Sequence, residues 1–286
     1  GRPLAYYYDR HKHELMRAGM MRSYMLSGWR PGERILNFWG ARQDLKPRGL
    51  RKRFGDAIAA ERTLGAHEVA EADLARWVDT IRRYRPVLLQ GYASILAELA
   101  RFVRDGNARL PATLKGVYST AEVLHDPQRA VMETTFGVKV FNQYGSREVP
   151  NIACECRHGN LHVFTDMVYL ESVREDGEDK LLVTSLTNRL MPFIRYDIGD
   201  SGRLQDGACT CGLPFPLLAM GLCRSNDLIR TRAGKLVYPS YFIHLLDGLE
   251  GIRRYRFVQT AYDRMTLELV AARPLAAAVA ATLRET

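Results

Sequence analysis

The segment that decides the fold occupies residues 138–148 and reads VKVFNQYGSRE. Its first four residues are apolar apart from one lysine, which is typical of a short buried strand. Polar residues follow at once, and Gly145 allows the backbone to approach a ligand closely. Ligands of open α/β sheets bind outside the carboxyl ends of the strands. The segment therefore predicts a strand that carries Asn142, Tyr144 and Glu148 to a binding site.

Strand-like and helix-like stretches alternate in the sequence before this segment. Short apolar runs predict strands at residues 35–40, 87–92 and 116–120. Amphipathic spacing and capping residues predict helices at residues 73–84, 94–103 and 126–136. This alternation indicates an α/β fold with a mostly parallel sheet and flanking helices.

Beyond Glu148 the pattern changes to short strands joined by acidic turns. Strands are expected near residues 161–164 and 180–186, which indicates an antiparallel subregion. A boundary is expected near Leu222, so that residues 1–222 form a large domain and residues 223–286 a small α+β domain. The expected elements of the small domain are a helix at residues 240–249 and strands near residues 256–259 and 267–270.

The composition is that of an ordinary globular protein. Hydrophobic residues make up 47% of the chain and charged residues 26%. No apolar run approaches the roughly 18 residues of a membrane span, and the chain opens with no apolar signal core, so we expect a cytoplasmic protein. The net charge of +9 is compatible with nucleic acid or phosphorylated ligands. Because the basic clusters are short and lack interleaved aromatic residues, we interpret the arginines as a scattered surface feature and expect no nucleic-acid partner. A zinc-stabilised nucleic-acid binder is the weaker alternative.

Four polar segments carry the candidate chemistry, and they are residues 119–122, 142–148, 191–200 and 224–229. Tyr144 offers a flat face to a purine, and Glu148 can hold a hard cation such as Mg²⁺ against phosphate oxygens. Asp200 can accept hydrogen bonds from ribose hydroxyls. Arg195 or Arg224 can offset phosphate charge. Together these segments predict a nucleotide pocket.

The order of these segments resembles the adenylate-forming superfamily, which comprises acyl-CoA synthetases and peptide-synthetase adenylation domains. Tyr-Gly-Ser-Arg-Glu at residues 144–148, Met-Pro-Phe-Ile-Arg-Tyr at residues 191–196 and Arg-Ser-Asn-Asp at residues 224–227 most resemble the phenylacetate–CoA ligase branch, and within it the relatives linked to capsular-polysaccharide biosynthesis. The resemblance covers the chain from Gly1 to about Pro239. It implies that ATP activates a carboxylate as an acyl-adenylate with release of pyrophosphate. A thiol, usually that of coenzyme A, then takes the acyl group.

The resemblance also implies a role for each matching residue. Tyr144 would stack on adenine, Asp200 would bind the ribose, and Glu148 would coordinate Mg²⁺. Glu148 and Arg224 are the expected catalytic residues, with Arg224 contacting the nucleotide near the hinge between the large domain and a C-terminal lid. The other expected nucleotide-binding residues are Thr120, Ala121, Glu122, Asn142, Gly145 and Ser146.

Two positions depart from the superfamily pattern. Arg147 stands where most members carry Thr or Ser, and Asn226 stands where the hinge residue is often an aspartate. The phosphate-binding loop of the superfamily would lie before Gly1, and its catalytic lysine would lie beyond Lys235, the last lysine of the chain. We therefore expect a fragment of a longer enzyme, in which the large domain and the lid are both incomplete. A non-catalytic module of the same fold is the alternative.

Four of the five cysteines form two Cys-x-Cys pairs, Cys154/Cys156 and Cys209/Cys211. In a cytosolic protein such pairs more often bind metal than form disulfides. Together with His158 and His162 they give six candidates for the four places of a structural zinc site. The alternative is that the cysteines are small buried apolar residues. The resemblance to zinc-binding relatives favours Cys156, His162, Cys209 and Cys211, and ranks Cys154 and His158 second.

The sequence leaves the acyl substrate, the final acceptor and the oligomeric state open. Aromatic acids are the precedent of the branch, and Tyr92, Ser94 and Ser119 are the suggested lining of the acyl pocket. A homodimer is among the open arrangements.

Overall fold

The computed structural model describes residues 4–39, 60–66, 69–175, 178–224, 229–230, 236–237, 252–261 and 264–271. Within these ranges the helices are α1 Arg10–Leu26, α3 Glu71–Tyr84, α4 Ala93–Asp105 and α5 Asp126–Phe136. The strands of the first part are β1 Ile35–Trp39, β2 Glu61–Gly65, β3 Leu88–Tyr92, β4 Gly116–Thr120, β5 Val140–Tyr144, β6 Ala153–Glu155 and β7 Leu161–Val163. The later strands are β8 Val168–Glu175, β9 Glu178–Ser185, β10 Tyr196–Gln205, β11 Leu217–Arg224, β12 Ile229–Arg230, β13 Leu236–Val237, β14 Ile252–Ala261 and β15 Arg264–Ala271.

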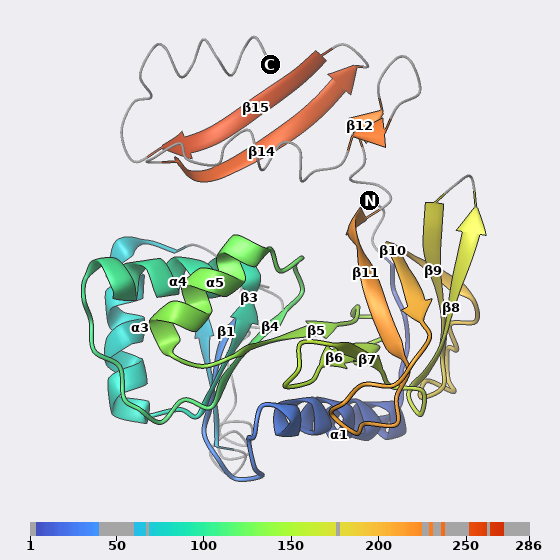
Figure 1. The fold of residues 1–286 in the computed structure, drawn as a ribbon, viewed down its shortest axis with the longest axis horizontal. Helices are drawn as coiled ribbons and strands as arrows, with labels where there is room; N and C mark the ends of the chain where they lie inside the picture. The colour runs from blue at the N-terminus through green and yellow to red at the C-terminus, as the bar shows by residue number, and fades with distance from the viewer. Residues whose placement is uncertain are drawn as a thin grey trace. The chain divides into compact units, whose positions relative to one another are not determined.

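One mixed sheet organises the chain (Figure 1), with strand order β2-β1-β3-β4-β5-β6-β7-β11-β10-β9-β8. The five strands from β2 to β5 run parallel. The pairs β5–β6, β6–β7 and β7–β11 are antiparallel. This arrangement confirms the predicted α/β fold class, including the antiparallel subregion after the parallel strands.

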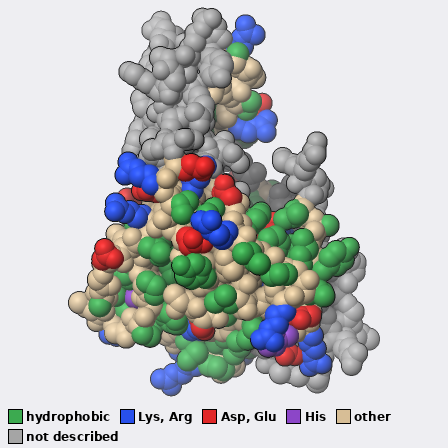
Figure 2. All heavy atoms as spheres, turned by 90° about the vertical axis from the view of Figure 1, so that its right-hand side faces the viewer, with side chains coloured by type: hydrophobic (Ala, Val, Ile, Leu, Met, Phe, Trp, Pro, Cys, Tyr) green, Lys and Arg blue, Asp and Glu red, His purple; other side chains and the backbone are tan. Residues whose placement is uncertain are grey.

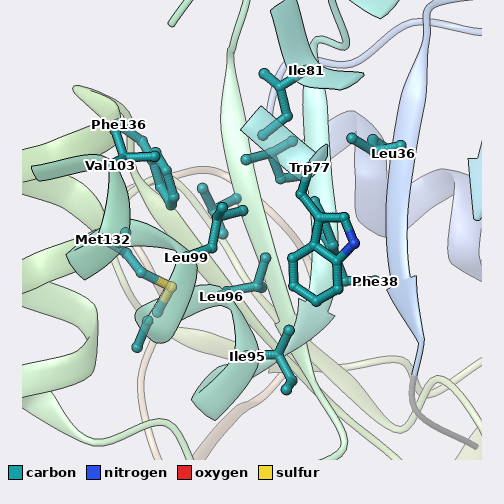
Figure 3. Packing of buried hydrophobic residues seen from close by; sticks show 14 of the residues in the cluster. Leu36, Phe38, Trp77, Ile81, Ile95, Leu96, Leu99, Val103, Met132 and Phe136 are labelled. Atoms are coloured by element: carbon teal, nitrogen blue, oxygen red, sulfur yellow. The ribbon is translucent and has the colours of Figure 1, made fainter. Parts of the chain in front are cut away.

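Helices α3, α4 and α5 cover one face of the parallel strands (Figure 1). Their apolar sides meet the strands in a buried cluster (Figure 3), in which the rings of Phe38 and Trp77 lie 4.9 Å apart. Leu96 and Leu99 of α4 and Met132 of α5 are fully buried in the same cluster. The spacing of these apolar residues predicts α3 and α4, so the core and the sequence pattern agree.

Helix α1 packs on the opposite face and was not predicted. The ring of Tyr24 lies 5.0 Å from the ring of Tyr118 in β4. The Tyr24 hydroxyl donates to Gln90 of β3 at 2.5 Å. The buried residues of α1 are Lys12, Gly19, Ser23 and Tyr24, which are mostly polar or small. Because this set has no apolar periodicity, the sequence pattern did not indicate the helix.

Local signals fix the ends of the predicted helices. Helix α3 ends where Arg85 adopts a left-handed φ of 49°, immediately before a proline. Helix α5 ends at Gly137, which has the predicted left-handed conformation with φ of 68°. The residue before the α5 helix is His125, whose backbone N–H donates to the Gln128 side chain at 3.1 Å. Asp126 is therefore the first residue of the helix, as the predicted range of residues 126–136 requires.

The chain divides into two compact units. The first comprises residues 1–173, 181–198 and 203–219, and the second comprises residues 174–180, 199–202 and 220–286. Within the second unit, β14 and β15 form a hairpin with Phe257 opposite Leu267 and an ion pair of 2.7 Å between Arg256 and Glu268. These strands include the predicted strands at residues 256–259 and 267–270. The helix predicted at residues 240–249 lies outside the described residues, and the boundary near Leu222 stays a prediction.

Candidate functional site

The carboxyl ends of three parallel strands align at one edge of the sheet. Tyr92 of β3 lies opposite Thr120 of β4, which lies opposite Gln143 of β5. The Thr120 hydroxyl donates to the Gln143 side-chain oxygen at 2.5 Å. In the adjacent row, Ser119 lies opposite Asn142. The predicted segments around Thr120 and Asn142, far apart in sequence, therefore meet at this edge.

A tight turn follows β5 and carries Glu148. The Ser146 N–H donates to the Val149 carbonyl at 3.0 Å, and the Val149 N–H donates to the Ser146 hydroxyl at 3.0 Å. A Cβ added at Gly145 would lie only 2.9 Å from the backbone nitrogen of Asn151. Glycine is therefore required at position 145 for the close backbone approach. The Ser146 hydroxyl accepts a hydrogen bond within the turn.

Two residues near the N-terminus reach this turn, and sequence reasoning missed both. The Tyr6 hydroxyl donates to the Arg147 carbonyl at 2.6 Å, and the Lys12 ammonium donates to the Glu148 carbonyl at 2.7 Å. Burial lowers the pKa of Lys12, whereas attraction to the Glu148 carboxylate raises it. These contacts span more than a hundred residues of sequence, so no local motif indicates them.

The segment after β4 has an unusual backbone and a structural carboxylate. Ala121 has a left-handed φ of 68°, which is rare for a residue other than glycine and tends to occur at functional sites. Glu122 accepts hydrogen bonds from the Ser94 backbone N–H at 2.8 Å and the Ser94 hydroxyl at 3.0 Å. Its carboxylate thus stabilises the first turn of α4, where unpaired N–H groups favour negative charge.

Aromatic and hydroxyl side chains also lie at the carboxyl ends of these parallel strands. The rings of Trp39 and Tyr92 stack 5.1 Å apart with an interplanar angle of 22°. The Ser119 side chain is fully buried, and its hydroxyl has no hydrogen-bond partner among the described residues. Of the three suggested lining residues, Tyr92 and Ser119 therefore belong to the aligned strand ends, and Ser94 is engaged by Glu122.

The remaining predicted nucleotide residues lie in the later strands or directly before one of them. Asp200 is buried within β10 and belongs to the second unit. The Arg195 side chain forms an ion pair with Glu171 at 3.1 Å, so that its charge is already partly neutralised. Arg224 is the last residue of β11, and its side chain lies outside the description, as do residues 225–228.

The four favoured metal candidates gather in a compact cluster. The ligand atoms of Cys156, His162, Cys209 and Cys211 all lie within 4.8 Å of one another. The sulfur atoms of Cys156 and Cys209 are 3.8 Å apart, and the Cys211 sulfur is 3.3 Å from Nε2 of His162. Tetrahedral zinc with Zn–S bonds of about 2.3 Å requires sulfur atoms roughly 3.8 Å apart. A disulfide would require about 2.05 Å, so the geometry fits a tetrahedral ion and excludes a bridge between Cys156 and Cys209.

Surrounding groups orient the ligands as a metal site requires. Nδ1 of His162 lies 3.1 Å from the Phe215 carbonyl, which leaves Nε2 directed at the sulfur atoms. The Asn160 amide donates to the Cys209 sulfur at 3.2 Å, and the Cys211 backbone N–H donates at 3.4 Å. The Cys211 N–H, and then the Asn160 amide, lower the pKa of Cys209 to about 6. These hydrogen bonds therefore favour the thiolate form of Cys209, the form that binds metal.

The two candidates ranked second lie in other surroundings. Cys154 is fully buried beside the hydroxyls of Tyr118 and Ser23, and burial raises its pKa to about 12. His158 is exposed, and its Nδ1 lies 2.7 Å from the Thr210 hydroxyl. Neither belongs to the described four-residue cluster.

The paired strands β5 and β6 connect the nucleotide segment to the metal cluster. Glu155 lies between Cys154 and Cys156, and its carboxylate accepts from Arg129 at 2.7 Å and from the Asn142 backbone N–H at 3.0 Å. Arg129 also donates to the Val140 carbonyl at 2.8 Å. Through Glu155 this ion pair ties the first cysteine pair to Val140 and Asn142 of β5.

Several solved CoA ligases are similar in fold to this chain. A 2-hydroxyisobutyryl-CoA ligase in complex with 2-HIB-AMP aligns with a TM-score of 0.70 and 20% identity, over 96% of this chain and 62% of that one. The anthranilate CoA ligase AuaEII in complex with anthranoyl-AMP aligns with a TM-score of 0.65 and 14% identity, over 94% of this chain and 55% of that one. The fold is therefore that of these CoA ligases.

Two curated proteins are similar to this chain in sequence. The chain is 28% identical to Protein CapK of Staphylococcus aureus over 215 residues, which covers 72% of this chain and 47% of CapK. It is 29% identical to the phenylacetate-coenzyme A ligase of Thermus thermophilus over 256 residues, which covers 84% of this chain and 56% of that enzyme. These similarities confirm the predicted resemblance to the phenylacetate–CoA ligase-like branch of the adenylate-forming superfamily.

The chain spans about half the length of the curated relatives that it matches. No protein-family model matches it. Among the described helices, none combines the length and the apolar character needed to cross a membrane.

Proposed function

We propose that this chain is the nucleotide-binding part of an ATP-dependent ligase that converts a carboxylic acid into an acyl-adenylate and then a thioester. In the first step a carboxylate oxygen bonds to the α-phosphorus of ATP while the bond to the bridging oxygen breaks and pyrophosphate leaves. In the second step a thiol sulfur, after losing its proton, bonds to the acyl carbon, and AMP leaves. Coenzyme A is the proposed thiol, because the similar 2-hydroxyisobutyryl-CoA ligase has been solved with both 2-HIB-AMP and CoA. Both ATP and coenzyme A would be met in the cytoplasm.

The observation that carries the proposal is the convergence of the nucleotide-like segments at one sheet edge. Thr120 and Gln143 are hydrogen-bonded neighbours there, and the turn that begins at Gly145 follows directly. In this proposal Tyr144 stacks on adenine, with the backbone of Ala121 beside it. The roles of Asp200 in binding ribose and of Arg224 in contacting the nucleotide are carried from the resemblance.

Glu148 is the proposed ligand of Mg²⁺. Its carboxylate has no hydrogen-bond donor among the residues that the structure describes, and its backbone is held by Lys12. Carboxylate oxygens are the hard ligands that Mg²⁺ prefers. When bound, the ion would offset the charge of the phosphate oxygens during displacement.

Zinc is the proposed occupant of the cysteine and histidine cluster. Three thiolates and one imidazole nitrogen suit zinc, and a set of four protein ligands leaves no open coordination position. We therefore propose a structural role, in which the ion joins the β6–β7 hairpin to the loop that carries Cys209 and Cys211.

ATP–pyrophosphate exchange on the complete gene product tests the proposed activity. A panel of aromatic and aliphatic carboxylic acids should contain at least one acid that drives exchange, and Glu148→Gln should reduce that exchange by about a hundredfold, as expected for loss of a positioned electrostatic group. Nucleotide binding without exchange for every acid tested would instead support a non-catalytic module of this fold.

A further inference from the structure

The turn that carries Glu148 is held from outside by the N-terminal segment. Two consecutive carbonyls, those of Arg147 and Glu148, accept hydrogen bonds from the Tyr6 hydroxyl at 2.6 Å and from the Lys12 ammonium at 2.7 Å. A carbonyl held by a cation is fixed more firmly than one held by a neutral donor, because charge-assisted hydrogen bonds are about twice as strong. The main chain of Glu148 is therefore anchored directly.

Lys12 is an unusual residue for a structural role alone. It is only 2% exposed, although lysine is almost never fully buried unless it is paired. Its ammonium lies 4.7 Å from the ring centroid of Tyr6 and 5.5 Å from that of Tyr8. Ring faces stabilise a cation at such distances. The aromatic residues thus make a site in which the charge of Lys12 is retained beside the turn.

Helix α1 fixes where Lys12 stands. The Asp9 carboxylate accepts from the Lys12 backbone N–H at 2.8 Å, which caps the first turn of the helix. Further along, the Asn151 side chain donates to the Met16 carbonyl at 2.8 Å. The helix therefore contacts the loop at Glu148 and again at Asn151, and Lys12 acts from a rigid support.

We propose that Lys12, enclosed by Tyr6 and Tyr8, is a positioning residue that aims the Glu148 carboxylate at the metal-bound phosphates. This inference rests on the proposed role of Glu148 as a magnesium ligand. In this proposal Lys12 acts on the Glu148 carbonyl and not on the nucleotide. Its effect passes through the turn, as that of groups that orient metal ligands commonly does.

The test compares Lys12→Met with the control Lys115→Met in the complete gene product. Lys115 also donates to a main-chain carbonyl, that of Gly28, at 3.1 Å, but it lies in an ion pair with Glu33. ATP binding is titrated by calorimetry at increasing Mg²⁺, and AMP binding is measured in EDTA. Hydrogen exchange of the amides at residues 146–149 reports on the turn without any ligand.

Lys12→Met should raise the Mg²⁺ concentration required for ATP binding by about tenfold or more, the usual cost of removing a group that orients a metal ligand. It should also speed exchange of the turn amides and leave AMP affinity in EDTA within about twofold, because the adenine contacts remain. Tyr6→Phe keeps the ring but loses one hydrogen bond, so it should shift the Mg²⁺ requirement by roughly fivefold. Lys115→Met should change neither the Mg²⁺ requirement for ATP binding nor the exchange of the turn amides.

Three results would overturn the inference. If Lys12→Met and Tyr6→Phe need no more Mg²⁺ for ATP binding than the wild type, Lys12 has no positioning role. The proposed function would then still stand, provided that the wild-type protein binds ATP. An equal loss of Mg²⁺-ATP and AMP affinity would assign Lys12 to general stability. Wild-type protein that binds no ATP at any Mg²⁺ concentration would refute the proposed function itself, and this inference with it.

Discussion

Removing metal from the cysteine and histidine cluster should destabilise the protein strongly. The purified protein should carry close to one equivalent of zinc. Four ligand atoms lie within 4.8 Å of one another, and the 3.8 Å separation between the Cys156 and Cys209 sulfur atoms equals the tetrahedral spacing of a zinc site. A chelator strong enough to compete with such a site should therefore lower the melting temperature.

Ligand crowding explains why the cluster needs an ion, and the strength of zinc binding determines the size of the effect. Two unit charges at about 4 Å repel by roughly 4 kcal/mol at an effective dielectric constant near 20. Without a cation, the thiols must therefore take up protons or move apart. If free zinc exceeds the dissociation constant by about 1,000-fold, the bound ion contributes roughly 4 kcal/mol to the folded state. One kcal/mol corresponds to about 2–4 °C in a unit of this size, so the melting temperature should fall by about 10 °C.

The assay combines metal analysis with thermal unfolding of single variants. Cys209→Ala should lose the zinc and melt as the chelated wild type does. His158→Ala should keep both zinc and melting temperature, because His158 contacts Thr210 and lies outside the cluster. Cys154→Ala is the matched buried control, and should keep zinc while losing some stability from its packing.

Two results would refute this reasoning about the cluster. Wild-type protein with less than about half an equivalent of zinc would show that the cluster is not a structural zinc site, since such a site is tightly filled at neutral pH. If Cys209→Ala keeps zinc and Cys154→Ala loses it, Cys154 is a ligand and Cys209 is not.

Three further predictions concern the strand ends. Arg129→Met should lower the free energy of unfolding by about 3 kcal/mol in denaturant titration, because it leaves the buried Glu155 carboxylate without its cation; an unchanged unfolding midpoint would contradict this. Gly145→Ala should cost about 1–3 kcal/mol and weaken nucleotide binding, since its Cβ would lie 2.9 Å from the Asn151 nitrogen; wild-type nucleotide affinity in this variant would argue against the close approach. Glu122→Ala should cost about 1 kcal/mol through loss of the α4 cap, and an equally stable variant would show that the cap contributes nothing.

Much of the parallel half of the fold could be predicted from local signals. The proline before β3 and the glycine after α5 mark element ends, and each acts through its own backbone restriction. Helix α1 could not be predicted, because its buried side includes Lys12, Gly19 and Ser23, which give no apolar period. Strand β7 confirms the strand predicted near residues 161–164, whereas β6 was not predicted, because its three residues are too few to show an alternation.

The candidate site was predictable in type but not in its supporting contacts. The Cys-x-Cys spacing indicates a metal site, yet spacing alone cannot choose between Cys154 and Cys156, which are two residues apart. The choice depends on surroundings supplied by distant segments, such as Tyr118 beside Cys154. Lys12 escaped prediction for the same reason, since the carbonyl that it contacts is 136 residues away.

The two candidate sites are mechanically connected through β5 and β6. Cys154 lies opposite Gln143, and Ala153 lies opposite Tyr144, so the strand that leads to Cys156 is the hydrogen-bonded neighbour of the strand that ends in the nucleotide motif. Glu155 reinforces this pairing through the Asn142 backbone N–H. An ion that holds Cys156 would restrain β6, and β6 in turn restrains β5 at the residues proposed to meet adenine. A metal without an open coordination position can therefore support nucleotide binding without taking part in the chemistry.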